Sequence, residues 1–297
     1  MNSGILLVDK PGGMTSHDVV ARVRRLAGTR KVGHAGTLDP MATGLLLIGV
    51  NSATRLLHHL VGLDKEYLAT VRLGAATTTD DAEGEIVELA PAEVVAAIGD
   101  EAIRDGMLRL TGELDQVPSS VSAVKVDGRR AYDRVRDGEQ VELAARRVTV
   151  TAFDLLDVRR ADAAIDLDVR VACTSGTYVR ALARDLGAAL GAGGHLTALR
   201  RTRVGGFEVA EAATLASLEA DGVAAALMSP ADAAARALPV VSVSPDDARD
   251  LGHGKRIAAP ADAVGTMAAI DGDRLVAVVE RRGDTLKVVT GFPQDYE

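Results

Sequence analysis

The chain has 297 residues, enough for two domains or for one large domain with a small additional one. Its 47% hydrophobic and 26% charged residues exclude a disordered or collagen-like chain, and the single Cys173 excludes an intrachain disulfide and a multi-thiolate zinc site. The net charge of -8 counts against nucleic-acid binding over the whole surface.

The first predicted elements are a strand, a turn and a helix. Residues 4–8 are apolar, and residues 10–13 have turn composition. Ser16 is predicted to cap a helix over residues 17–27, in which valines recur at helical spacing and arginines point outward.

The middle of the chain mixes strands and helices without regular alternation. Residues 45–50, 67–73 and 165–172 are predicted strands, and residues 178–190 are a predicted helix. This order favours an α+β fold around an antiparallel or mixed sheet over a doubly wound parallel sheet.

The last part of the chain changes in composition near residue 238. Residues 212–237 are alanine-rich and predicted to be helical. Residues 275–279 and 286–289 are predicted strands of a hairpin with its turn at residues 280–284, which indicates a small β module. We therefore expect domains at residues 1–238 and 239–297.

Basic residues gather in two groups that contain no acid. The groups are Arg22, Arg24, Arg25, Arg30 and Lys31, and then Arg200, Arg201 and Arg203. An acidic chain divided in this way can still present a basic face to a nucleic acid, although ordinary solvated charge is the alternative.

The sequence has no Walker loop, G-x-G-x-x-G, H-E-x-x-H or paired C-x-x-C motif. We therefore expect neither a nucleotide cofactor nor a zinc site. Neither a signal peptide nor a membrane-spanning segment is predicted, and we expect a cytoplasmic protein that makes no use of a membrane.

The glycine-containing loop at residues 31–44 carries Asp39 at its centre, directly before a buried strand. Pro40 biases Asp39 toward an extended backbone, and the glycines allow close approach of a ligand to the main chain. An isolated Asp-Pro pair is more typical of a plain turn.

Residues 36–44 resemble, without a mismatch, the G-x-L-D-P-x-A-T-G loop of the TruB-type tRNA pseudouridine synthases. Further motifs of that family occur in the family's order over residues 4–207. D-K-P with T-S lies before this loop, and K-E-Y, S-A-V-K, C-T-S-G-T-Y-V-R and L-R-R-T lie after it. One departure is Gln116-Val117-Pro118-Ser119, where relatives usually have Q-x-P-P.

The resemblance implies a pseudouridine synthase fold, with a central mixed, mainly antiparallel sheet flanked by helices and a small PUA-like, RNA-binding C-terminal β module. It also implies isomerisation of the uridine at position 55 in the T-loop of tRNA, by base flipping and an aspartate nucleophile, with no cofactor and no metal. Whether the aspartate attacks the ribose or the base stays open.

The resemblance implies a role for each matching side chain. Asp39 is the nucleophile, Tyr67 stacks on the flipped base and is a candidate proton acceptor, and Arg180 pairs with the aspartate. The other implied substrate contacts are Tyr178, Leu199 as a pocket wall, His34 toward the T-loop, and Lys10 as a phosphate contact or a support of the loop. The implied contacts to the RNA backbone are Arg129, Arg130, Arg200 and Arg201.

The expected partner is the T-arm stem-loop of tRNA, bound by a monomer that needs no protein partner and no guide RNA. The main alternative is a tRNA-folding chaperone without catalysis, which would use the same RNA-binding surface and survive loss of Asp39. A glycoside-processing enzyme is disfavoured because no second acid accompanies Asp39 in the matched motifs.

Overall fold

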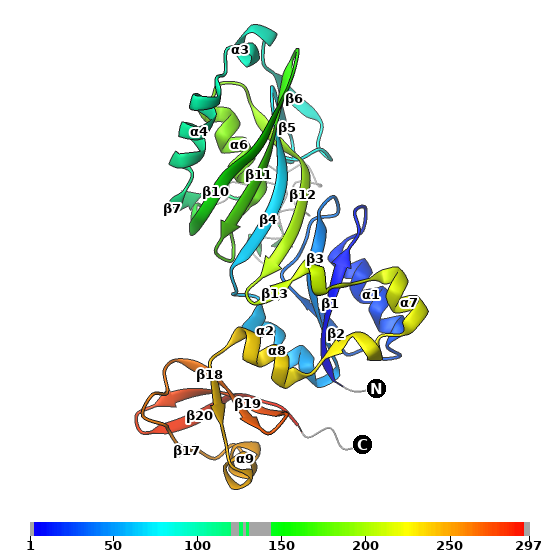
Figure 1. The fold of residues 1–297 in the computed structure, drawn as a ribbon, viewed down its shortest axis with the longest axis vertical. Coiled ribbons are helices and arrows are strands. Elements are labelled where there is room, and N and C mark those ends of the chain that lie inside the picture. The colour runs from blue at the N-terminus through cyan, green and yellow to red at the C-terminus, as the bar shows by residue number, and fades with distance from the viewer. Residues whose placement is uncertain (1–2, 120–124, 127–128, 131–143, 294–297) are drawn as a thin grey trace. The chain divides into compact units, whose positions relative to one another are not determined.

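The computed structural model describes residues 3–119, 125–126, 129–130 and 144–293, which form two compact units (Figure 1). Unit 1 combines Met1–Leu63 with Arg203–Glu297, and unit 2 is Asp64–Thr202. The domain boundary expected at residue 238 stays a prediction, since unit 1 holds residues from both sides of it.

Unit 1 contains a mixed sheet built around two apolar strands. Strand β1 (Gly4–Lys10) pairs antiparallel with β3 (Thr43–Val50) and parallel with β14 (Ala213–Thr214). Strands β2 (Val32–Ala35) and β15 (Leu227–Met228) extend it antiparallel to β3 and β1. The strands predicted at residues 4–8 and 45–50 are confirmed, and nearly every residue in them is buried.

Helix α1 (Ser16–Leu26) buries Val19, Val20 and Val23 and packs against β2. The predicted cap, Ser16, is wrong by one residue. Thr15 has an extended backbone, and its hydroxyl accepts from the Asp18 amide while the Asp18 carboxylate accepts from the Thr15 amide, which makes a complete capping box. Ser16 is the first helical residue and its hydroxyl is used elsewhere.

The alanine-rich stretch at residues 212–237 was predicted to be helical throughout. It forms two short helices with a strand between them. Gly222 ends α7 (Leu215–Asp221) with a positive φ of 82°, and Ser229 caps α8 (Pro230–Ala237). The other short elements of unit 1 before residue 238 are η1 (Asn51–Arg55), α2 (Leu57–Leu60), β13 (Phe207–Glu208), η2 (Val209–Glu211) and η3 (Ala224–Ala226).

The expected C-terminal β module is confirmed. Its five-stranded sheet has the order β16 (Val240–Ser242), β18 (Thr266–Asp271), β19 (Arg274–Arg282), β20 (Thr285–Gly291) and β17 (Ile257–Ala258), with α9 (Pro245–Gly252) packed against it. The turn of the predicted hairpin is shorter than residues 280–284, because β19 and β20 continue to Arg282 and Thr285 and leave only Gly283, with φ 63°, and Asp284.

Unit 2 is an antiparallel sheet with helices on it. The order is β12 (Gly194–Val204), β4 (Lys65–Leu73), β11 (Ala164–Cys173), β10 (Arg146–Ala161) and β7 (Gly112–Gln116), and the pairs β4–β11, β11–β10 and β10–β7 are antiparallel. Helices α4 (Asp100–Arg109) and α6 (Val179–Ala189) pack against each other and against this sheet (Figure 1).

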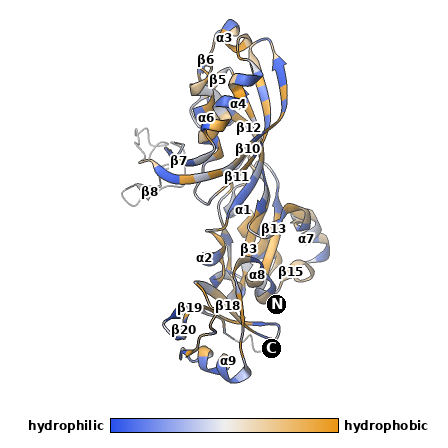
Figure 2. Cartoon of the chain, turned by 60° about the vertical axis from the view of Figure 1, so that its left-hand side comes forward, coloured by the Kyte–Doolittle hydropathy of each residue, from blue (hydrophilic) through white to orange (hydrophobic). Residues whose placement is uncertain are grey.

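Burial alternates along β4 and β11, so that one face of this sheet is apolar and the other carries charge. Figure 2 shows the corresponding alternation of hydrophobic and hydrophilic residues along the long strands. The shorter elements are β5 (Ala75–Thr77), β6 (Ile86–Leu89), α3 (Ala92–Ala96), β8 (Lys125–Val126) and β9 (Arg129–Arg130). No helix of the described residues is long and apolar enough to cross a membrane.

Candidate functional site

Asp39 lies in the loop that joins β2 to β3, at the tip of an antiparallel hairpin. The loop is anchored on both sides, since Leu38 is 3% exposed and Ala42 is fully buried. Asp39 itself is half-buried, and its carbonyl accepts a hydrogen bond from the Ala42 amide at 3.1 Å. A carboxylate is thus presented from a shaped loop on a buried strand, as the sequence predicts.

The main chain of both neighbours of Asp39 is held by residues far away in the sequence. The Ser16 hydroxyl accepts from the Leu38 amide at 2.9 Å and donates to the Leu38 carbonyl at 3.1 Å. On the other side, the Pro40 carbonyl accepts from the Gly13 amide at 2.9 Å and from Lys10 Nζ at 3.2 Å. The turn at residues 10–16 therefore shapes the aspartate loop.

Lys10 is fully buried at the end of β1. Besides the Pro40 carbonyl, its ammonium donates to the carbonyls of Pro11 at 2.9 Å and Met14 at 2.6 Å. Three carbonyl acceptors around one buried ammonium favour support of the loop over a phosphate contact, the two roles that the sequence left open.

His34 lies on β2, half-buried, and contacts a second histidine. The ring of His17, an exposed residue of α1, stands edge-on to it with centroids 5.4 Å apart and an interplanar angle of 84°. Sequence reasoning did not single out His17, because an exposed polar residue in the first turn of a helix has no pattern that marks it.

Two of the predicted base-contacting residues of unit 2 lie on neighbouring strands. Tyr67 on β4 and Leu199 on β12 are each 8% exposed. Lys65 points to the same face of β4 as Tyr67, opposite Cys173 on β11. Burial, with Arg201 nearby, lowers the pKa of Lys65 to about 8, and burial raises the pKa of Cys173 to about 11.

Arg180, in the first turn of α6, is held by a carboxylate that sequence reasoning missed. Its Nη1 lies 3.3 Å from Asp81 Oδ2, and the two side chains are 5% and 3% exposed. The same nitrogen donates to the Thr79 carbonyl at 2.8 Å. Asp81 also accepts from the Thr79 hydroxyl and, at 3.0 Å, from the Glu83 amide. Because this segment is polar and turn-like, nothing in its pattern indicates a buried ion pair.

The departure from Q-x-P-P adds a hydroxyl to this network. Ser119 is fully buried, donates to the Thr79 carbonyl at 3.0 Å and lies 3.4 Å from Arg180 Nη1. A second pair stands beside the first, with Arg184 Nη1 3.3 Å from Asp80 Oδ2. Burial raises the pKa of Asp80 in spite of that arginine.

Tyr178 precedes α6 in an extended conformation and is positioned by a side-chain amide. The Tyr178 amide donates to Gln116 Oε1 at 2.8 Å, and Gln116 Nε2 donates to the Tyr178 carbonyl at 3.1 Å. Gln116 is 4% exposed at the end of β7. The helix predicted over residues 178–190 therefore begins at Val179, with Tyr178 extended before it and Arg180 already helical.

The arginines predicted to contact the RNA backbone differ in exposure. Arg200 is half-buried, whereas Arg201 is 1% exposed, so of these two Arg200 has the exposure that a phosphate contact requires. Arg129 and Arg130 form β9, which pairs with β8, and their side chains lie outside the described structure, as do residues 122–124 of the S-A-V-K motif.

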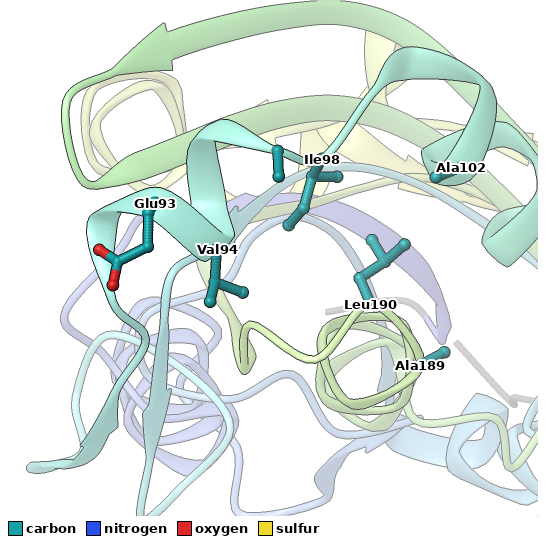
Figure 3. A pocket seen from close by; sticks show the side chains of 7 residues that line it. Glu93, Val94, Ile98, Ala102, Ala189 and Leu190 are labelled. Atoms are coloured by element: carbon teal, nitrogen blue, oxygen red, sulfur yellow. The ribbon is translucent and has the colours of Figure 1, made fainter.

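Within the described ranges, no cluster of three or more His, Cys, Asp or Glu side chains is arranged to hold a metal ion. A surface pocket of about 570 Å³ lies in unit 2 between α3, α4 and the end of α6 (Figure 3). Its lining is aliphatic apart from Glu93, and it contains none of the predicted site residues.

Three family models match the chain in succession. The N-terminal domain of the TruB family pseudouridylate synthases matches residues 24–179, the tRNA pseudouridylate synthase B C-terminal domain matches residues 180–235, and the C terminal of tRNA pseudouridine synthase II matches residues 238–293.

Similar proteins extend over almost the whole chain. The tRNA pseudouridine synthase B of Leifsonia xyli subsp. xyli is 59% identical over 99% of this chain and 98% of its own. That of an Arthrobacter species is 55% identical over 97% and 93%. Among solved structures, a Cbf5-Nop10-Gar1 complex contains a chain with a TM-score of 0.74 and 27% identity, covering 98% of this chain and 85% of that one.

Proposed function

The chain belongs to the TruB family of pseudouridylate synthases, and we propose that it isomerises the uridine at position 55 in the T-loop of tRNA with Asp39 as the nucleophile. The activity is that of an isomerase, a tRNA pseudouridine synthase. The observation that carries the assignment to Asp39 is the clamped loop, in which the main-chain groups of its two neighbours, Leu38 and Pro40, are hydrogen-bonded to the buried side chains of Ser16 and Lys10.

The chemistry needs a nucleophile, a proton acceptor and a place to hold the freed base. The bond between ribose C1′ and uracil N1 breaks, the base turns, and C1′ bonds to C5. The proton on C5 leaves and N1 gains one, so the atoms of substrate and product balance without an oxidant or a reductant. An aspartate carboxylate, with an ordinary pKa near 3.9, is ionised at neutral pH and can act as the nucleophile.

The proposal gives the residues of unit 2 the task of binding and orienting the flipped base. Tyr67 supplies a stacking face and a hydroxyl, and Leu199 an apolar wall. Arg180 supplies a guanidinium to the nucleophilic carboxylate. The buried contact to Asp81 supports this role, because it fixes the direction of the side chain before substrate binds.

The proposal also covers partners. We expect a monomer in the cytoplasm that binds the T-arm through Arg129, Arg130 and Arg200, and the C-terminal β module, matched by the family's C-terminal domain, to contribute to RNA binding. The relatives named tRNA pseudouridine synthase B support tRNA as the substrate, whereas the Cbf5 chain of similar fold comes from a complex with other proteins. Light scattering of the purified chain, with and without RNA, tests the monomer.

The decisive experiment is tritium release from a T-arm stem-loop labelled at C5 of the target uridine. Wild type, Asp39→Asn and the control Asp105→Asn, an exposed carboxylate on α4, are compared at equal RNA occupancy. We expect release by wild type and the control, and a loss of at least about 10³-fold in Asp39→Asn. RNA binding without release by wild type would refute the synthase assignment for this substrate, and equal rates in wild type and Asp39→Asn would refute the nucleophile.

A further inference from the structure

We infer that Ser16 is a positioning residue for the nucleophilic aspartate: its hydroxyl holds the peptide group that precedes Asp39. The inference rests on the proposed function for its catalytic meaning. Ser16 is not the helix cap that its sequence position suggests, because Thr15 performs that task.

The Ser16 hydroxyl bonds both main-chain groups of Leu38, as a neighbouring backbone segment would. The Ser16 hydroxyl accepts from the Leu38 amide at 2.9 Å and donates to the Leu38 carbonyl at 3.1 Å. A hydroxyl has one proton and two lone pairs, so it can make both bonds at once. Ser16 is 1% exposed and Leu38 is 3% exposed, so water does not replace either bond in the folded chain.

The support behind Ser16 is rigid. Ser16 is the first residue of α1, whose start is set by the capping box of Thr15 and Asp18. Val19, Val20 and Val23 anchor the same helix in the core, and α1 packs against β2, which leads into the aspartate loop (Figure 1). The position of the hydroxyl is therefore fixed independently of the loop that it holds.

Ser16 acts on one side of Asp39 only. The Pro40 side is held by the Gly13 amide and Lys10 Nζ. With both neighbouring residues fixed, little backbone freedom is left at Asp39 and its carboxylate can be aimed by side-chain rotation alone. Removing the Ser16 hydroxyl releases the Leu38 side while the Pro40 side stays held. The loop then stays in position, but the direction of the Asp39 carboxylate is no longer fixed. Small misplacements of a reacting group cost about 10²-fold in rate.

The test compares Ser16→Ala with Thr15→Ala. The two positions are adjacent, both lose one hydroxyl, and both affect the start of α1. Thr15→Ala removes the helix cap and leaves the Leu38 contacts, whereas Ser16→Ala does the reverse. Ser16→Cys is the second variant, because a thiol keeps the size of the side chain with much weaker hydrogen bonds and tolerates burial.

The first readout is hydrogen exchange at the Leu38 amide, which does not depend on activity. We expect exchange at least about tenfold faster in Ser16→Ala than in Thr15→Ala, relative to the amides of β3, which report general opening. The second is the single-turnover rate of tritium release at saturating protein. We expect a loss of about 10- to 100-fold in Ser16→Ala and a smaller loss in Ser16→Cys, with the Kd for the T-arm changed less than about threefold.

The outcomes distinguish failure of the positioning role of Ser16 from failure of the proposed synthase function. Unchanged Leu38 exchange in Ser16→Ala, or equal single-turnover rates in Ser16→Ala and Thr15→Ala, overturns the positioning role. If Ser16→Ala does not fold, Ser16→Cys decides in the same way. If Leu38 exchanges fast in Ser16→Ala but wild type releases no tritium, the Ser16 contact is confirmed and the proposed function is refuted.

Discussion

Replacing Gln116 by methionine should lower the free energy of unfolding by about 2–4 kcal/mol, because two backbone groups of Tyr178 lose the partner that the buried Gln116 side chain provides. The Tyr178 amide loses its bond to Gln116 Oε1, and an unsatisfied buried donor costs about 1–3 kcal/mol. The Tyr178 carbonyl loses Nε2 but still accepts from the Leu182 amide at 3.3 Å, so this loss is near 1 kcal/mol.

Gln116→Glu gives the same contact a dependence on pH. A carboxylate can still accept from the Tyr178 amide, but it faces the Tyr178 carbonyl where the amide nitrogen had donated. Only the protonated acid can donate there, so the folded state raises the pKa of the new carboxyl above its ordinary value near 4.3. The stability of Gln116→Glu is then fullest at acid pH and is lost as the pH rises through the folded-state pKa. We expect it to match wild type more closely at pH 5 than at pH 8.

Urea unfolding followed by far-UV circular dichroism measures both effects. Glu113→Gln is the matched control, since this residue lies on the same strand but its side chain is 67% exposed and its solvent-screened pair with Arg147 adds little to stability. The single-turnover rate of Gln116→Met should fall more than its affinity for RNA, because Tyr178 leads directly into Arg180. A Gln116→Met variant within 0.5 kcal/mol of wild type, about the scatter of harmless surface changes, would refute the reasoning.

Two further predictions concern buried charges. Because the pKa of Lys65 is lowered to about 8, the folded state releases its proton before the unfolded state does, and wild type should gain stability relative to Lys65→Met as the pH rises from about 8 to 10.5, by about 3 kcal/mol at most. Identical pH dependence of urea unfolding in the two proteins would contradict this. Asp81→Asn should cost about 3–5 kcal/mol and slow the single turnover, because it removes the buried carboxylate that faces the Arg180 guanidinium. Asp115→Asn, whose side chain is 66% exposed, is the control, and equal unfolding midpoints in the two variants would contradict it.

The elements that sequence reasoning found have a strong local signal. Residues 45–50 are an unbroken apolar run, and they form β3, in which every residue from Gly44 to Val50 is buried. The alternation at residues 67–73 and 165–172 likewise matches β4 and β11. The prediction of helix throughout residues 212–237 was wrong because it too followed the local signal. Alanine favours helix in any context, whereas the short strand between the two helices depends on its pairing with β1.

The aspartate was found because its loop carries its own punctuation of glycine and proline. The contacts that hold the site carry no such mark, although Ser16 and Gln116 lie within the family motifs T-S and Q-x-P-P. Ser16, Asp81 and Gln116 are single polar residues whose partners lie far along the chain, 22 residues away for Ser16 and Leu38 and 62 for Gln116 and Tyr178. Period and turn chemistry describe neighbours in sequence, so they do not detect a contact of this kind.

The three contacts have a common physical form, and this explains why they are hidden. In each, a buried polar side chain satisfies groups next to a predicted site residue: Ser16 beside Asp39, Gln116 at Tyr178, and Asp81 on Arg180. A buried polar group must be paired, so each of them would be costly to keep unless its partner were in place. The same requirement makes them useful as supports, since a side chain that has one favourable arrangement transmits that arrangement to the residue that does the chemistry. The family motifs include Ser16 and Gln116, but only the fold shows which main-chain groups their side chains hold.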